Sequence, residues 1–312
     1  MKLFNNRTRL FTTGLVLMSS LLFHSVAIAQ DEEKTDSTEK KEVKKPKPAK
    51  IFESVWIGDN QTVTVPVKKT FEMDISHRFG TVKKGYEDFW GFFAPSNIRL
   101  GVSYAPIKNL NVGIGITKSN MIWDGSAKYA IIQQTKGIYP VSVSYFGDVS
   151  YDTRKDEDGS IFKYPEDRVM FFNQLIIARK VTRNLSVQVA PSVSHQNSVF
   201  GYYYLLDSTG KKGIGKEMKN DHFAISFSAL YKLTTVTSVF INYDQPITKH
   251  TVGNPDPNLQ FGVEFNTSNH SFQLFVGNYA LLSPQRNNLY NHNNYKDGEF
   301  LIGFNITRLW NY

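Results

Sequence analysis

The 312-residue chain contains no cysteine, and outside its first 30 residues it has no long apolar segment. Without cysteine, a disulfide scaffold, a cysteine nucleophile and a thiolate zinc site are all excluded. No later stretch approaches about 18 consecutive apolar residues, which excludes a helical membrane protein. The mean hydropathy of −0.33 is that of a soluble protein or of a transmembrane β-barrel, whose strands hydropathy does not detect.

The sequence also lacks the common catalytic and nucleotide-binding motifs. No G-x-S-x-G, H-E-x-x-H, phosphate-binding or dinucleotide-binding fingerprint occurs, so we predict no enzyme activity, cofactor or metal site. Two minor alternatives are a lipid hydrolase that uses His195 and a metal site shared by His77, His195 and His222. Pairing residue 180 with residue 185 would place His195 opposite Met170, with no lipid-facing serine beside it.

The first 29 residues have the pattern of a secretory signal peptide. A short apolar run, 15–23, precedes the small-residue cleavage motif Ala27-Ile28-Ala29 and follows the basic residues Lys2, Arg7 and Arg9. Removal of this segment takes away three positive charges and no negative one, so the formal net charge falls from +8 to +5. An exported chain of modest charge is not expected to bind nucleic acid.

Residues 30–50 mix acidic residues with seven lysines and show no apolar periodicity. The segment ends in Lys45-Pro46-Lys47-Pro48, which favours an extended polyproline-like backbone. We predict a disordered, charged periplasmic tether. The alternative is a docking tail for a periplasmic partner.

From residue 70 onward, apolar and polar residues alternate with the period of a β-strand. In residues 110–117, for example, Leu110, Val112, Ile114 and Ile116 alternate with asparagine, glycine and threonine. The pattern predicts twelve strands, at 70–79, 97–105, 110–118, 125–134, 140–151, 168–180, 185–195, 221–232, 236–245, 257–266, 271–280 and 299–312.

The predicted connections alternate between short and longer segments. Short periplasmic turns and long extracellular loops are typical of an outer-membrane barrel, and an even strand number leaves both termini in the periplasm. In lipid a sheet must close, because an open edge would leave backbone groups unpaired. We therefore predict an all-β, transmembrane antiparallel barrel over residues 51–312 in the cell outer membrane, with a soluble β-sandwich as the alternative.

The polar positions of these strands are predicted to face the lumen. The charged members of this inward set are Glu72, Asp74, Arg78, Arg99, Lys128, Asp148, Asp244 and Glu264. Both signs are present, so we predict no strong ion selectivity.

The last strand carries a further signal. Apolar residues share one face of it, and the chain stops on an aromatic residue; the members that we assign to a C-terminal assembly signal are Phe304, Ile306, Trp310 and Tyr312. This pattern predicts recognition by the outer-membrane assembly machinery.

Two segments depart from the simple barrel pattern. Residues 169–172 and 175–178 are apolar on both faces, which indicates a bulge or a lumen packed by something apolar. Residues 51–69 lie just before the first strand and carry Phe52, Val55, Trp56 and Ile57. They are a possible plug or periplasmic segment, or residues 61–67 add strand length.

Several stretches resemble an uncharacterised Bacteroidetes outer-membrane β-barrel family, catalogued as domain of unknown function 5777. They are FEMDISHRFG (71–80), APSNIRLG (94–101), WDGSAKYAI (123–131), HSFQLFVGN (270–278) and IGFNITRLW (302–310). The resemblance implies a barrel in outer-membrane lipid and no established activity. The leading functional hypothesis is a channel or transport-associated barrel for small solutes. The alternatives are a non-conducting scaffold or surface-adhesion barrel and an outer-membrane hydrolase.

Overall fold

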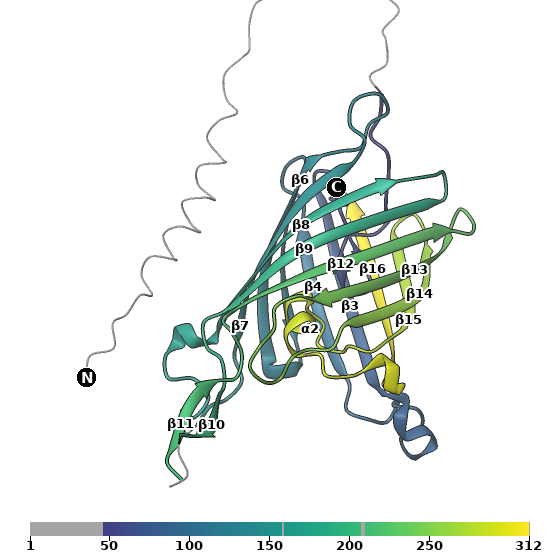
Figure 1. The fold of residues 1–312 in the computed structure, drawn as a ribbon. Helices are drawn as coiled ribbons and strands as arrows, with labels where there is room; N and C mark the ends of the chain where they lie inside the picture. Colours follow the sequence, from purple (N-terminus) through teal and green to yellow (C-terminus); the bar gives the residue numbers. More distant parts are fainter. Residues whose placement is uncertain (1–45, 158, 207–209, 312) are drawn as a thin grey trace, which may run out of the picture. The chain divides into compact units, whose positions relative to one another are not determined.

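The computed structural model describes residues 46–157, 159–206 and 210–311. The predicted signal peptide, most of the predicted tether and Tyr312 lie outside these residues. Residues 46–312 form one compact unit, in which twelve antiparallel strands close into a barrel (Figure 1).

The strands of the barrel agree closely with the prediction. They are β3 (Thr70–Thr81), β4 (Asn97–Tyr104), β5 (Leu110–Thr117), β6 (Ile122–Ile132), β7 (Ser142–Asp152), β8 (Val169–Lys180), β9 (Leu185–Gln196), β12 (Asp221–Lys232), β13 (Thr237–Pro246), β14 (Asn258–Asn266), β15 (His270–Gly277) and β16 (Leu301–Asn311). Each strand pairs with its sequence neighbour in the barrel, and β16 pairs with β3 to close it. The predicted fold class is confirmed.

Alternation decides which side of each strand faces the lumen. In β9 the inward side chains of Ser186, Gln188 and Ser192 are buried, while the intervening Val187 faces outward. Similar outward positions on the other strands carry exposed apolar residues such as Leu100, Ile114 and Phe227. A polar inner face and an apolar outer face are what a barrel in lipid requires.

The two ends of the barrel differ. At one end the strands are joined by short turns, and the C-terminus lies there (Figure 1). At the other end the connections 82–96, 153–168, 197–220, 247–257 and 278–300 are long. We refer to these as the short-turn end and the long-loop end.

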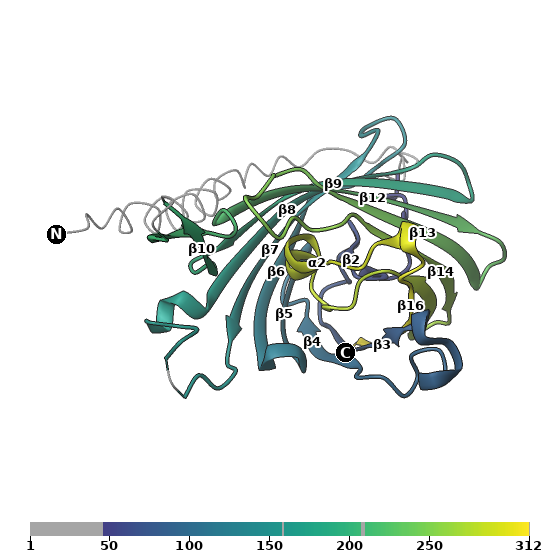
Figure 2. The same cartoon turned by 60° about the horizontal axis from the view of Figure 1, so that its bottom comes forward.

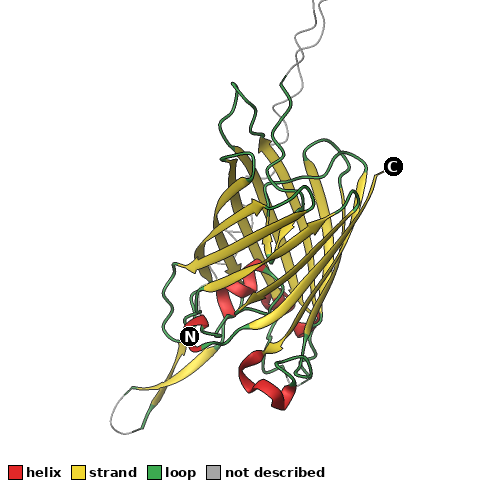
Figure 3. Ribbon diagram, turned by 90° about the vertical axis from the view of Figure 1, so that its right-hand side faces the viewer, coloured by secondary structure: helices red, strands yellow, loops and turns green. Residues whose placement is uncertain are grey.

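Several elements in the connections at the long-loop end were not predicted. They are the separate hairpin of β10 (Gly201–Leu205) and β11 (Lys212–Lys216), helix α2 (Pro284–Tyr290), and the 3₁₀ helices η1 (Val82–Asp88), η2 (Ser119–Met121), η3 (Pro165–Arg168) and η4 (Tyr295–Asp297). The helices gather toward the long-loop end (Figure 3). Among the described residues, no helix is long and apolar enough to cross a membrane.

The chain before β3 runs inside the barrel. Its two short strands, β1 (Trp56–Ile57) and β2 (Asn60–Gln61), pair with each other and not with the wall. The alternative that residues 61–67 lengthen a barrel strand is therefore wrong. A view toward the long-loop end shows β2 and α2 within the ring of strands (Figure 2). We call residues 51–63 the lumen hairpin.

Candidate functional site

The lumen hairpin turns back on itself at Gly58 and Asp59. Ile57 pairs with Asn60 across this two-residue turn, a length that favours glycine because it needs positive φ. Gly58 has φ +58°, and a Cβ there would lie 1.6 Å from Gln260 Oε1. Glycine is thus required both by the turn and by the closeness of the wall.

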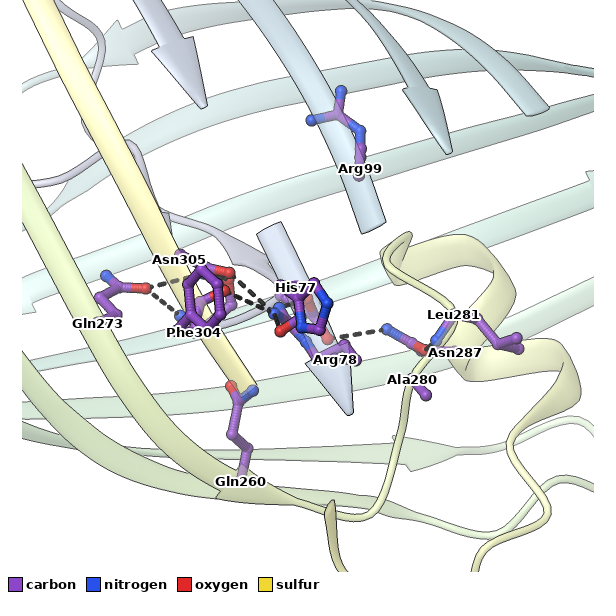
Figure 4. A network of polar contacts seen from close by, with 12 residues as sticks. His77, Arg78, Arg99, Gln260, Gln273, Ala280, Leu281, Asn287, Phe304 and Asn305 are labelled. Atoms are coloured by element: carbon purple, nitrogen blue, oxygen red, sulfur yellow. Dashed lines mark hydrogen bonds and ion pairs between the residues drawn. The ribbon is translucent and has the colours of Figure 1, made fainter. Parts of the chain in front are cut away.

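The tip of the hairpin is bonded to the wall on several sides. Arg78 on β3 forms a buried ion pair with Asp59, and its guanidinium also donates to Asn305 Oδ1 at 3.0 Å. Asn305 on β16 donates to the Gly58 carbonyl at 2.7 Å. On β15, Gln273 Oε1 accepts from the Gly58 N–H at 3.0 Å. Figure 4 shows Arg78, Asn305 and Gln273 in one network of polar contacts.

The two arms of the hairpin are also held by side chains of the wall. Gln188 on β9 accepts from Val63 N at 3.1 Å and donates to Gln61 O at 2.8 Å. The hydroxyl of Ser144 on β7 donates to Val63 O at 2.8 Å. Asn242 on β13 donates to Ile57 O at 2.7 Å. These bonds satisfy backbone groups that have no partner within so short a hairpin.

Apolar packing complements these polar contacts. Ile51, Phe52, Ile57 and Val63 of the lumen hairpin belong to one buried cluster with inward side chains of the wall, namely Phe146, Phe172, Ile176, Ala178, Ala190, Leu230, Phe240 and Phe275. The two-faced apolar stretch at 169–178 contributes three of these wall residues. Its inner face packs in the lumen, and its outer face belongs to the exterior of the barrel.

Helix α2 enters the lumen from the long-loop end. Ser283 caps its N-terminus by accepting from Arg286 N at 3.5 Å, and Pro284 occupies the first helical position. Within the lumen, Asn287 donates to Asp59 Oδ2 at 3.3 Å, so the helix meets the tip of the hairpin. Tyr290 donates to Gln196 on β9. The interior is thus occupied from both ends.

The predicted inward charges do not line an open passage. Arg99 donates to Asp74 at 2.7 Å and to Asp124 at 2.6 Å and 3.1 Å, forming a buried cluster on β3, β4 and β6. Its guanidinium also lies over the ring of Trp56, 5.4 Å from the centroid. One arginine between two carboxylates is a satisfied arrangement for buried charge.

Lys128 and Glu72 lie beside this cluster. Lys128 donates to Gln61 Oε1 at 2.8 Å and to Thr62 O at 3.1 Å, both on the lumen hairpin. Glu72 is buried and, with Lys128 and Trp56, lines a cavity of about 20 Å³. That volume holds about one water molecule, so it is no route for a solute.

The remaining predicted charges lie apart from one another. Asp148 accepts from Ser150 at 2.7 Å. Asp244 accepts from Asn60 of the lumen hairpin at 2.8 Å. Glu264 accepts from Gln273 at 2.6 Å. The predicted charges therefore contact the hairpin, the wall or, as with Arg99 and Asp74, one another, and they form no ring around a pore.

Sequence reasoning missed Asp124 and most of the amide side chains that bind the hairpin. The predicted strand began at residue 125, one position too late to include Asp124. Amides such as Gln188 and Asn305 also have inward parity, so strand alternation is the signal that finds them. The pair Gly58-Asp59 directly after Val55-Trp56-Ile57 is a sequence signal for a hairpin.

The predicted pairing of 180 with 185 is wrong by one residue. Lys180 pairs with Ser186, and His195 therefore lies opposite Phe171 on β8 and Asp221 on β12. His195 Nδ1 lies 2.7 Å from Asp221 Oδ1. No serine is its direct neighbour on either strand, so the corrected register still gives no support to a lipid hydrolase.

The three rim histidines do not meet. His77 stacks on Phe304 outside the barrel, whereas His222 faces inward and lies 2.8 Å from His250 Nε2. Within the described residues, no group of three or more metal-ligating side chains is found.

The described members of the predicted C-terminal signal lie on β16. Phe304, Ile306 and Trp310 are half-buried and alternate with the inward Asn305 and Thr307. Trp310 contacts the ring of Phe71, 5.6 Å between centroids. Tyr312 lies outside the described residues.

A family model described as a membrane-bound β-barrel domain, DUF5777, matches residues 52–310. The chain belongs to this family. Because the match begins at Phe52, the DUF5777 domain includes the lumen hairpin as well as the barrel strands.

No curated protein matches the chain. Similar solved structures include the NanC porin (10% identity, TM-score 0.43, 78% of this chain and 99% of that one), the KdgM porin (11%, 0.42, 77% and 99%) and the COG4313 outer membrane channel from Pseudomonas putida F1 (10%, 0.47, 79% and 97%). The family match by itself makes this DUF5777 protein a membrane β-barrel.

Proposed function

We propose that this protein is a channel-type barrel of the outer membrane whose passage for small solutes is closed by the lumen hairpin. The supporting observation is the pattern of hydrogen bonds that side chains of β6, β7, β9, β13, β15 and β16 donate to the hairpin. Beside the apolar cluster, the wall thus carries serine, glutamine and asparagine side chains, which are suited to water once the hairpin leaves.

The alternative is a permanently closed barrel that acts as a scaffold or surface-adhesion protein. In its favour, α2 fills the long-loop end of the lumen and meets Asp59. The β10–β11 hairpin also presents the exposed side chains of Tyr203 and Ile214 at that end.

Conductance in planar bilayers separates these two functions. We expect the full chain to show few or no channel events. The triple variant Asp59→Ala, Asn60→Ala, Gln61→Ala removes the side chains that bind Arg78, Asp244 and Lys128, and we expect it to conduct. The control Glu157→Gln changes an exposed loop residue and should behave as the full chain does.

Folding of each variant is checked by the shift in gel mobility between unboiled and boiled samples. If the unchanged chain conducts as well as the triple variant, the hairpin is not a plug. If a correctly folded triple variant stays silent, the channel proposal is overturned in favour of the scaffold.

The cellular context belongs to the same proposal. We infer export by the signal peptide at 1–29, insertion by the assembly machinery through Phe304, Ile306, Trp310 and Tyr312, and placement of the short-turn end in the periplasm. The described end of the charged tether, where Ala49 N donates to Gln134 O, would then face the periplasm.

A further inference from the structure

A cluster of aromatic side chains stands exposed in the loop that follows β3. Residues 82–93, which we call the aromatic segment, comprise η1 and the turn after it. Their exposed aromatic side chains range from 40% to 81% in exposure and are Tyr86, Phe89, Trp90, Phe92 and Phe93. So many exposed aromatic rings within one short segment mark a surface that something apolar covers.

The aromatic segment is continuous with the outer face of the barrel. The ring of Phe92 lies 4.5 Å from that of Phe79, the outward residue near the end of β3. Phe79 in turn lies 4.5 Å from His77 and 6.3 Å from Phe304, both on the outer face. The exposed rings therefore extend the lipid-facing surface at the long-loop end.

The backbone holds these rings outward at a cost. Phe89 and Trp90 have φ of 52° and 54°, a left-handed conformation that bulky residues rarely adopt. Gly91, with φ 83°, follows them, and its carbonyl accepts from Gly80 N at 3.0 Å. Asp88 accepts from Gly91 N at 2.9 Å. Strained residues fixed in this way point to a role for the side chains that they present.

Charged side chains flank the aromatic rings on the same segment. Lys83 and Lys84 are exposed, and Lys83 pairs with Glu299 at 2.6 Å. Aromatic rings beside lysines are the composition found where membrane proteins meet lipid headgroups. Figure 1 places this segment at the edge of the barrel, beyond the end of β3.

We propose that the aromatic segment is a lipid anchor that lies in the headgroup region of the leaflet at the long-loop end. Its occupant is lipid, because the rings join the lipid-facing surface through Phe79. The anchor does not depend on whether the lumen opens.

Site-specific fluorescence tests this anchor directly, because the chain has no native cysteine to mask. The variant Phe93→Cys is labelled with an environment-sensitive dye, and the full chain is folded into phosphatidylcholine vesicles. We expect blue-shifted emission, strong quenching by lipid that is spin-labelled near its headgroup, and little quenching by aqueous iodide.

Two matched variants calibrate the result. Ile114→Cys reports a residue on the lipid-facing wall, and Tyr203→Cys reports an exposed aromatic position on the β10–β11 hairpin. If the dye at 93 is as accessible to iodide as the dye at 203, the anchor is ruled out and the segment is free to bind a protein instead. Should Phe93→Cys fail to fold, a fall in the lipid-quenched tryptophan signal in Trp90→Phe is the equivalent supporting result, because Trp123 still contributes from the outer face. An unchanged signal overturns the proposal.

Discussion

At the residue scale, Arg78 and Asp59 form a buried ion pair between hairpin and wall. Arg78 is fully buried, donates to the carbonyl oxygens of His77 and Phe304, and lies over the ring of Phe275. Removing one partner of a buried ion pair destabilises a protein far more than replacing both partners together.

We therefore predict that Arg78→Met lowers the free energy of unfolding by about 3–5 kcal/mol, because Asp59 would lose its charged partner. The double variant with Asp59→Asn should lose less than the sum of the two single variants. Denaturant unfolding in vesicles measures this cycle, and additive effects would contradict a direct coupling.

Glu53, at the start of the lumen hairpin, should make the stability of the fold depend on pH. Burial raises the pKa of this carboxyl, but hydrogen bonds from Lys232 and Lys50 outweigh it, and the pKa lies below its ordinary value of 4.5. A depressed carboxyl pKa stabilises the fold above the unfolded value, and the contribution is lost as the pH falls through the folded value.

We accordingly expect Glu53→Gln to lower the melting temperature at pH 7. The difference from the unchanged chain should vanish once the pH falls well below 4.5. Glu157→Gln, in an exposed loop, serves as the control, and a difference that persists at low pH would argue against the ion pairs as its cause.

At the element scale, the structure of the loops is determined by local turn and capping geometry more than by periodic alternation of apolar and polar residues. Helix α2 has a serine cap and a proline at its first position, and Ser283-Pro284 is a sequence signal for the start of a helix. The strands of the β10–β11 hairpin have only five residues each. Short elements of this kind carry too few residues for a periodic pattern to emerge.

The aromatic segment provides a test at this scale. A Cβ on Gly91 would lie 2.2 Å from the Gly80 carbonyl oxygen, in addition to its positive φ. Gly85 also has positive φ, 59°, but nothing lies within 4 Å of its added Cβ. We expect Gly91→Ala to expose the segment to protease in vesicles much more than Gly85→Ala does, and equal cleavage would refute the packing against β3.

At the scale of the whole molecule, the outer face must remain apolar because it meets lipid. Ile114 is an outward residue of β5, and Ile107 lies in the turn before that strand. Arginine on the lipid face costs about 2–4 kcal/mol at the membrane midplane and about 0–1 kcal/mol at the interface.

Ile114→Arg should therefore fold into vesicles poorly, while Ile107→Arg should fold almost normally. The fraction that shows heat-modifiable mobility measures this difference. Equal yields would contradict the assignment of the β5 exterior to lipid. The natural Arg308 has an interfacial place too, near the end of β16, over the ring of Trp310.

The sequence by itself determined the barrel, its twelve strands and the face of each strand, because a period of two residues marks burial directly. It also identified the inward charges and singled out residues 51–69. Only the tertiary structure decided what those charges contact. Arg78 binds Asp59, Lys128 binds the hairpin, and Arg99 bridges two wall carboxylates, through distances that parity does not encode. Closure of the sheet brings strands from both ends of the chain around the lumen hairpin. The lumen is therefore filled, which the sequence alone did not decide.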